Sequence, residues 1–287
     1  VINLDEGWNG ISSYLQPFFP HPDEVFDEIS DQLIILQHFG QIYWPAYNIN
    51  TIGNFQPDKG YAVKVTANSD LQIIGVETET TSITINAGWN IMPVKSPCNL
   101  PAFELLSQMG PAFVIAYEIG GNALLWPAQG IYSLQAFEPG KAYMLKSNQE
   151  MNFVFPACDY SKESIAQPDV RITNNTPWTL PDPIPGKHII GVPYDILNEV
   201  AGEGDFIGVF TQRGDCMGIS AIQKETTALP AYPDDVSTNV KDGFAEAEPM
   251  YFRIFNPAND RQKEISFNWS TDYPNFNGLF ATNGISL

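Results

Sequence analysis

The sequence predicts a mainly β protein with short helices: two duplicated α+β modules followed by an all-β sandwich of immunoglobulin or fibronectin type. Three observations lead to this prediction. Residues 2–15 and 83–95 contain the same Gly-Trp-Asn phrase between apolar stretches. Further aromatic and turn motifs follow each phrase in the same order. From residue 170 onward, short apolar runs alternate with turns rich in Gly, Asn, Asp and Pro.

The repeat preserves order, spacing and aromatic identity. Trp8 corresponds to Trp89, and Trp44 corresponds to Trp126. The segments IYWPAYNINTIGNF (42–55) and PDKGYAVK (57–64) are answered by LLWPAQGIYSLQAF (124–137) and PGKAYMLK (139–146). Chance does not preserve all three properties together, so we expect one module over residues 1–78 and a second over 79–157.

Each copy is expected to have the same order of elements. A strand leads through Gly-Trp-Asn into a second strand, and a short helix and further strands follow. The helix is expected at 22–30 in the first copy, after a Pro-Asp-Glu start, and at 100–109 in the second. The later strands are expected at 33–38, 60–65 and 71–75, and at 113–119, 142–146 and 152–156.

The Gly-Trp-Asn phrase is interpreted as structural rather than catalytic, because whole modules duplicate more readily than isolated catalytic loops. Gly7 and Gly88 are expected to allow a turn. The tryptophan is expected to fill the core of its module, and the asparagine to cap the turn with its side chain.

After the second copy, residues 158–169 are polar and without periodicity, and we interpret them as a linker. The module over 170–287 contains six candidate strands separated by turns. These strands are VRITNN, HIIGVPY, DFIGVFTQRG, CMGISAIQKE, PMYFRIFNP and KEISFNW.

Composition and charge exclude some partners. The chain has 14 basic and 33 acidic residues, a net charge of −19, and only 16% charged residues overall. Such a polyanion repels nucleic acids and anionic membranes, so no nucleic-acid partner is expected. No apolar run approaches the length of a membrane span, so no membrane insertion is expected.

The three cysteines are Cys98, Cys158 and Cys216, and none has the spacing of a zinc or iron–sulfur site. Cys98 and Cys158 bracket the second copy, so they are the candidate disulfide, with Cys216 unpaired. Two buried free thiols are the alternative.

Catalytic motifs are not evident. The three histidines, His21, His38 and His188, lie outside any Ser- or Cys-centred motif. A pair of carboxylates could hydrolyse glycosides, but sequence alone does not pair them. We therefore expect no enzyme and keep a glycoside hydrolase as the least favoured alternative.

The loop YPDDVSTNVKDGF places four hard oxygen donors close in sequence: Asp234, Asp235, Asn239 and Asp242. Calcium takes six to eight such ligands, although the spacing is not that of an EF-hand. Calcium is therefore the one candidate cofactor, and a long polar connection between strands is the alternative.

Aromatic residues around the two Trp-Pro-Ala loops are candidates for stacking on sugar rings: Trp44, Tyr47, Trp126 and Tyr132. Aromatic residues in β modules also serve as core. Exposure of the two indoles decides between these interpretations.

The motifs GWNGISSYL, IYWPAYNINTIGNF and KGYAVKV, with GWNIMPV, LLWPAQGIYSL and PGKAYMLK, resemble a tandem module of large secreted proteins that Gram-negative bacteria export by the type IX secretion pathway. The segments DFIGVFTQRGDCMGISAI and DGFAEAEPMYFRIFNP resemble a β module that follows in such proteins. The resemblance implies an extracellular, cell-surface location and a noncatalytic role, and it supplies no catalytic residues.

We therefore expect a noncatalytic extracellular surface protein with an adhesive or structural role, or a segment of one, whose work is display, cell-surface attachment or self-assembly. Its partners would be cell-surface glycans, other copies of itself or modules of its parent protein. An array of carbohydrate-binding modules that uses the Trp-Pro-Ala loops is the alternative.

Overall fold

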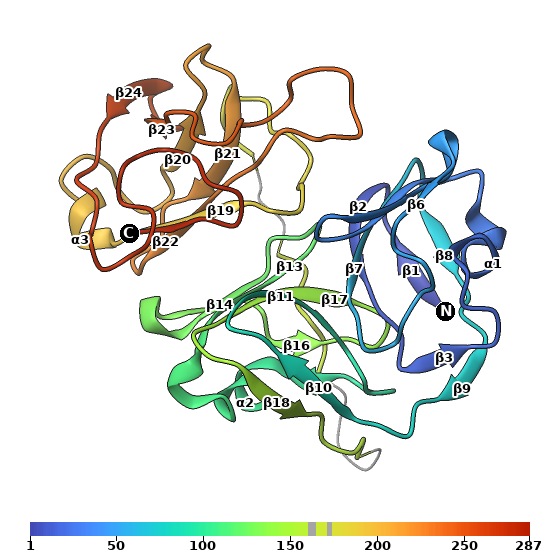
Figure 1. The fold of residues 1–287 in the computed structure, drawn as a ribbon. Helices are drawn as coiled ribbons and strands as arrows, with labels where there is room; N and C mark the ends of the chain where they lie inside the picture. Colours follow the sequence, from blue (N-terminus) through green and yellow to red (C-terminus); the bar gives the residue numbers. More distant parts are fainter. Residues whose placement is uncertain (160–164, 171–173) are drawn as a thin grey trace. The chain divides into compact units, whose positions relative to one another are not determined.

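The computed structural model describes residues 1–159, 165–170 and 174–287, and it divides into two compact units (Figure 1). The first unit comprises residues 1–128 and 132–170, and it contains both copies of the repeat. The second comprises residues 129–131 and 171–287. Residues 160–164 of the expected linker and 171–173 of the expected first strand of the last module lie outside the described residues.

The expected fold class is confirmed: strands dominate, and the helices are short. They are α1 (Pro22–Val25), α2 (Ala102–Ser107) and α3 (Tyr194–Leu197). The first helix is shorter than the predicted 22–30, because Phe26 leaves helical geometry (φ −107°, ψ 13°) and a separate 3-10 turn follows over Asp27–Ile29. Pro22 and the acidic first turn stand at its start, as predicted.

The two copies build the same five-stranded antiparallel sheet. The first sheet has the order β2 (Gly7–Ile11), β7 (Tyr61–Val65), β4 (Leu33–His38), β5 (Gln41–Trp44) and β6 (Ile49–Asn50). The second has the order β11 (Gly88–Pro93), β17 (Ala142–Ser147), β13 (Phe113–Glu118), β14 (Leu124–Trp126) and β15 (Ile131–Tyr132). Identical strand order shows that the sequence repeat is a repeat of structure.

Short two-stranded ribbons extend these sheets. The pair β1 (Ile2–Leu4) and β8 (Ser69–Leu71) in the first copy corresponds to β10 (Ser82–Ile85) and β18 (Met151–Val154) in the second. Two further ribbons pair β3 (Leu15–Pro17) with β9 (Gly75–Glu77), and β12 (Leu100–Pro101) with β16 (Ala136–Phe137).

The Gly-Trp-Asn phrase lies where the chain passes from each two-stranded ribbon into its five-stranded sheet. Gly7 and Gly88 both have a φ of +96°, a conformation that favours glycine. The Asn9 side chain accepts the Asp5 N–H (3.0 Å) and donates to the Asp5 carbonyl (2.7 Å). Asn90 does the same with Asn86, at 2.9 Å in both directions. The predicted cap is confirmed in both copies.

Each copy has its own apolar core with a matching aromatic pair. The rings of Phe55 and Tyr61 stack at 4.6 Å in the first copy, and those of Phe137 and Tyr143 meet edge-on at the same distance in the second. Both tyrosine hydroxyls accept a backbone N–H five residues earlier in the chain, at 2.9 and 3.1 Å. These pairs explain why the two tyrosines recur.

The two copies pack directly on each other. The Ser12 N–H donates to the Gly140 carbonyl (2.8 Å), and the Ser12 hydroxyl accepts the Val94 N–H (3.0 Å). A Cβ added at Gly10 would lie 2.2 Å from the Ala142 carbonyl oxygen, so only glycine fits at this contact.

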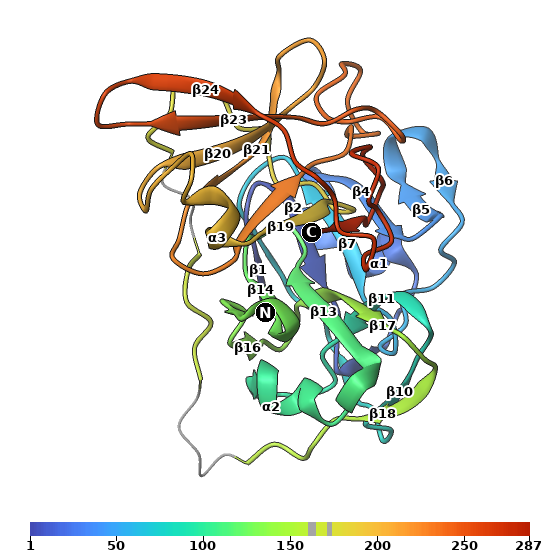
Figure 2. The same ribbon diagram turned by 90° about the vertical axis from the view of Figure 1, so that its left-hand side faces the viewer.

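The second unit is a β-sandwich. One sheet has the order β22 (Thr227–Ala231), β19 (His188–Val192) and β25 (Ile285–Ser286). The other has the order β21 (Cys216–Ala221), β20 (Phe206–Phe210), β23 (Tyr251–Asn256) and β24 (Arg261–Ile265), and Figure 2 shows β23 and β24 as a long hairpin at its edge. Apolar side chains from both sheets form its core, among them Ile190, Leu229, Val209 and Phe252.

Within the described part of the chain, no helix is long and apolar enough to cross a membrane.

Candidate functional site

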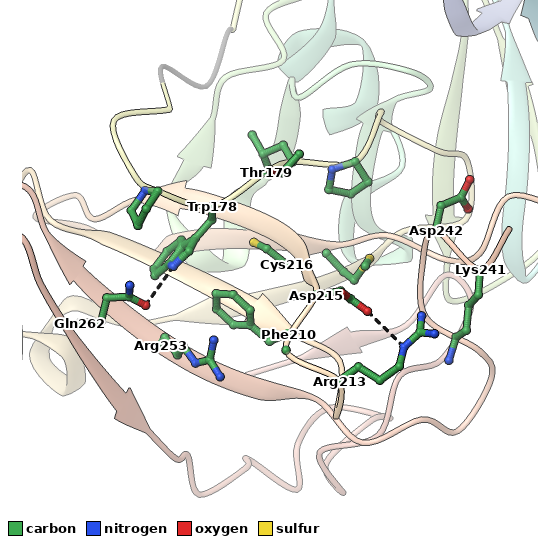
Figure 3. Close-up of a pocket in the computed structure, with 15 residues that line it drawn as sticks. Trp178, Thr179, Phe210, Arg213, Asp215, Cys216, Lys241, Asp242, Arg253 and Gln262 are labelled. Carbon is green, nitrogen blue, oxygen red and sulfur yellow. Dashed lines mark hydrogen bonds and ion pairs between the residues drawn. The ribbon is translucent and has the colours of Figure 1, made fainter.

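A pocket of about 740 Å³ lies in the second unit, at one end of the four-stranded sheet (Figure 3). Its lining comes from four separate parts of the chain. These are the segment 177–181, the β20–β21 hairpin, the loop at 241–242 and the neighbouring strands β23 and β24. The volume falls in the usual range for small-molecule sites.

Aromatic rings form one wall of the pocket. Trp178 meets Phe210 edge-on at 5.0 Å, and its indole N–H donates to the Gln262 side-chain oxygen (3.1 Å). The guanidinium of Arg253 lies over the Phe210 ring, 4.5 Å from its centroid. This cation–π contact holds Arg253 beside the pocket, and its Nη2 also lies 3.4 Å from Glu264 Oε1.

Charged side chains of both signs line the opposite wall. Arg213 Nε lies 3.1 Å from Asp215 Oδ2 at the tip of the β20–β21 hairpin, and Lys241 lies 2.5 Å from Glu248. Figure 3 shows Arg213, Lys241 and Asp242 together on this side. Exposed ion pairs contribute little stability, so a polar ligand can replace the partner of Arg213 in the exposed Arg213–Asp215 pair at small cost.

Cys216 lines the same pocket but is not suited to nucleophilic chemistry. Burial raises the pKa of its thiol to about 11, and the Sγ atom points to the Gly218 carbonyl at 3.5 Å. A thiol with this pKa stays protonated at neutral pH, and the thiolate is the nucleophile. The pocket therefore offers binding groups rather than an activated sulfur.

His188 and Ser286 form a buried pair elsewhere in the second unit. His188 Nε2 lies 2.7 Å from Ser286 Oγ, while Nδ1 accepts the Ala281 N–H at 3.1 Å. Nδ1 is therefore the acceptor nitrogen, Nε2–H donates to the serine, and the serine hydroxyl donates to the Asn275 carbonyl. A general base must accept the serine proton, so these bonds run in the wrong direction for catalysis.

The same histidine predicts a pH dependence of stability. Burial lowers the pKa of His188 to about 4 from its ordinary 6.5. Between these values the unfolded chain binds a proton that the folded chain does not, so stability falls as the pH drops from 6.5 towards 4, by roughly 3 kcal/mol. Urea unfolding across this window measures the slope.

His188→Gln is the matched control for that slope, because its amide can accept and donate in the same directions without titrating. Carboxylates contribute equally to both proteins. If the slopes of the wild type and the variant between pH 4 and 6.5 are the same, His188 does not titrate as the structure indicates.

The expected sugar-stacking residues do not form one surface. Trp126 is 1% exposed, so its indole has no free face for a sugar, and the expectation that both indoles stack is corrected for Trp126. Trp44 is partly exposed and meets Tyr47 edge-on at 4.6 Å, with Tyr47 64% exposed. Tyr132 is exposed beside Phe103, at 5.4 Å.

The expected calcium loop folds on its own hydrogen bonds. Asp234 Oδ1 accepts the Asp242 N–H (2.8 Å), and Asp242 Oδ1 accepts the Asp235 N–H (2.9 Å). Asp235 Oδ1 accepts the Ser237 N–H (2.8 Å), and Asn239 is exposed. Among the described residues, no group of three or more His, Cys, Asp or Glu side chains is placed to hold a metal ion. Calcium binding here stays a prediction.

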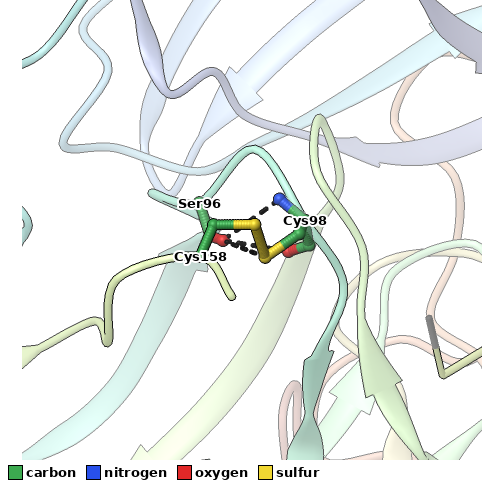
Figure 4. Close-up of a disulfide and its surroundings, with 3 residues drawn as sticks. All are labelled: Ser96, Cys98 and Cys158. Carbon is green, nitrogen blue, oxygen red and sulfur yellow. Dashed lines mark hydrogen bonds between the residues drawn. A yellow bond between two sulfur atoms is a disulfide. The ribbon is translucent and has the colours of Figure 1, made fainter. Parts of the chain in front are cut away.

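Cys98 and Cys158 are joined by a disulfide that closes the second copy (Figure 4). The Ser96 hydroxyl accepts the Cys98 N–H (3.2 Å) and holds the turn that carries the first sulfur. The chain after Cys158 returns to the same copy, because the Gln167 side chain bonds to the backbone at 133–136. Cys216 is a free, buried thiol.

Sequence reasoning did not find the pocket, because its residues come from segments far apart along the chain. Trp178, Phe210 and Arg253 have no common motif. The sequence predicts Asp242 as a calcium ligand, and only the structure places it in the same pocket lining as Arg213 and Lys241.

Comparison with known proteins adds no assignment: no family model matches the sequence, and no curated protein or solved structure matches it.

Proposed function

We propose that this chain is a noncatalytic extracellular segment of a bacterial surface protein, with an adhesive or structural role. The observation that supports this proposal is that the repeated residues have structural roles in both copies. In both copies, Gly-Trp-Asn bridges a break in the sheet and the repeated tyrosine caps a backbone N–H. The duplication therefore repeats residues that hold the backbone in place. A structural module of this kind, duplicated in tandem, serves to present a surface.

The disulfide supports the extracellular location. Bonds such as Cys98–Cys158 form and persist in oxidising compartments and are rare in reducing ones. The acidic surface and low content of charged residues suit a secreted β protein. Partners of this segment would be cell-surface glycans, further copies of the chain or neighbouring modules of a parent protein.

The test is a glycan-array screen of the purified chain, combined with sedimentation analysis of self-association and an assay for reducing ends on every glycan that binds. We expect glycan binding or concentration-dependent association without cleavage. Release of reducing ends would contradict the noncatalytic role and revive the hydrolase alternative. A monomer that binds no glycan would contradict the adhesive and structural roles together.

A carbohydrate-binding surface on the Trp-Pro-Ala loop of the first copy is a second candidate. The Trp44–Tyr47 pair favours it, because Tyr47 is exposed, Trp44 is partly exposed, and aromatic faces stack on sugar rings. Trp44→Ala with Tyr47→Ala is expected to weaken glycan binding at least about tenfold, a loss of about 1.4 kcal/mol. Glycan binding that is equal in the double variant and the wild type would remove this candidate.

A further inference from the structure

A groove of about 430 Å³ lies inside the first unit, between the two copies of the repeat. Its walls come from the end of β4 and the loop before β7 in the first copy, and from β10, β11 and β18 in the second. The side chains that line it include His38, Phe39, Lys59, Thr84, Trp89 and Asn152.

The groove lies where the two copies of the repeat differ. Trp8 and Trp89 occupy the same position of the Gly-Trp-Asn phrase, yet Trp8 is 5% exposed while Trp89 is partly exposed and lines the groove. The β13–β14 turn of the second copy packs on the backbone of Trp8. A Cβ added at Gly120 in that turn would lie 1.8 Å from the Trp8 carbonyl oxygen.

The corresponding turn of the first copy makes no such close approach. Trp89 meets Tyr117 edge-on at 5.6 Å, and Lys146 Nζ lies over its ring at 5.5 Å. A Cβ added at Gly40 would meet nothing within 4 Å. Its neighbour Phe39 is 49% exposed, whereas Ile119, the equivalent residue of the other turn, is 3% exposed. One turn packs closely on the backbone of the other copy, and the other turn carries an exposed aromatic ring beside the groove.

Hydrogen bonds hold the wall of the groove that the first copy contributes. His38 Nδ1 lies 2.8 Å from the Gly60 carbonyl, and the Gly60 N–H donates across the seam to the Ile91 carbonyl (3.2 Å). Phe39 has a φ of +51°, a strained value for a non-glycine residue. Such strain clusters at ligand-binding positions.

The second copy has a charged pair that the first copy lacks, and the equivalent residues of the first copy line the groove. In the second copy, Glu118 pairs with Lys141 at 3.4 Å. The equivalent residues of the first copy are His38 and Lys59, which line the groove. Burial lowers the pKa of His38, so its imidazole is neutral at physiological pH and does not repel the lysine.

The chemistry of the lining selects a ligand class. Opposite charges on Asp58 and Lys59 cancel, and the remaining polar groups are hydroxyls and amides, including Thr84 and Asn152. The net charge of −19 disfavours anions. A tryptophan beside such groups suits a ring that is apolar on its face and hydroxylated at its edge.

We propose that this groove binds a neutral saccharide, with Trp89 and Phe39 packing on the sugar ring and Asn152 and Thr84 bonding its hydroxyls. The inference goes beyond the proposed function, because it rests on the groove alone and does not depend on where the protein resides. It also differs from the Trp-Pro-Ala candidate, which uses Trp44 and Tyr47.

Isothermal titration of the whole chain with neutral trisaccharides (cello-, xylo-, manno- and maltotriose), and with trigalacturonate as the anionic arm, tests the proposal. At least one neutral probe is expected to bind with a Kd of about 1 mM or tighter. Asn152→Ala and Phe39→Gly are expected to weaken this binding at least about fivefold, and Trp89→Phe to weaken it as well. Phe39→Gly suits the left-handed backbone, so folding is preserved.

Phe19→Ala is the matched control, because it removes an aromatic ring of the first copy that is 71% exposed and does not line the groove. It is expected to leave the titration unchanged. Four results would overturn the proposal: no neutral probe binds at about 10 mM; trigalacturonate binds more tightly than every neutral probe; neither Asn152→Ala nor Phe39→Gly weakens binding; or Phe19→Ala abolishes it. If Trp44→Ala abolishes binding while Asn152→Ala and Phe39→Gly leave it unchanged, the Trp-Pro-Ala candidate stands in place of the groove.

Discussion

Gly120→Ala is expected to destabilise the first unit by about 4 kcal/mol. Two effects add at this position. Gly120 has a φ of +76°, where an L-residue is strained by about 1–2 kcal/mol. The new Cβ would also lie 1.8 Å from the Trp8 carbonyl oxygen, and backbone atoms move less readily than the ends of flexible side chains. Overpacking of this kind adds about 1–3 kcal/mol.

Two other glycines of the same unit separate these effects. Gly88 has a φ of +96° but nothing within 4 Å of an added Cβ, so Gly88→Ala is expected to lose only the strain, about 1–2 kcal/mol. At Gly40 neither effect applies, and Gly40→Ala is expected to change stability by less than about 1 kcal/mol.

Urea unfolding of the three variants, monitored by circular dichroism, measures the series. The expected order of destabilisation is Gly120, then Gly88, then Gly40. Equal losses for Gly120→Ala and Gly88→Ala would mean that the turn at Gly120 does not pack tightly on the Trp8 backbone. The turns at Gly120 and Gly40 would then not differ in the way described for the groove.

The architecture of the first unit could be predicted from sequence because the repeat exposes it. A phrase that occurs twice with the same flanking apolar pattern indicates a module, and the capping role of Asn9 and Asn90 follows from local chemistry. These hydrogen bonds need only the Gly-Trp-Asn phrase and the backbone four residues before its asparagine, so they form in both copies although that residue is Asp5 in one and Asn86 in the other.

What lies between the copies could not be predicted in this way. Trp8 and Trp89 have the same neighbours in sequence, and both were expected to fill a core. Their exposure differs in the fold, and so does the packing of two turns distant from them along the chain, at Gly120 and Gly40. The phrase Trp-Pro-Ala likewise does not specify what covers the indole, and Trp126 is 1% exposed.

The pocket of the second unit illustrates a further limit. Acidic residues in the loop at 232–244 indicate oxygen ligands for a cation, yet Asp234 and Asp242 accept backbone N–H groups of their own loop. A carboxylate in a turn can serve either purpose, and the sequence does not state which donor is nearest. The neighbouring Arg213 and Lys241 become part of a site only through the fold.

Removing the disulfide is expected to destabilise the first unit by about 4 kcal/mol, because Cys98 and Cys158 close a loop with a sequence separation of 60. The bond restricts the unfolded chain, so its effect grows with loop length. In the folded protein it ties the end of the second copy to the turn at Ser96. The double variant Cys98→Ala/Cys158→Ala, unfolded in urea, measures the loss.

Cys216→Ala provides the matched control, since it removes a buried thiol from the second unit and leaves the bond intact. Thiol titration of the denatured wild type should detect one group before reduction and all three cysteines after it. Reduced wild type and the double variant should unfold at the same urea concentration. Three reactive thiols without reductant, or equal stability of the double variant and the oxidised wild type, would contradict the bond. The support that it gives to an oxidising compartment would then be lost as well, whereas the groove at Trp89, which does not depend on that bond, would remain to be tested on its own terms.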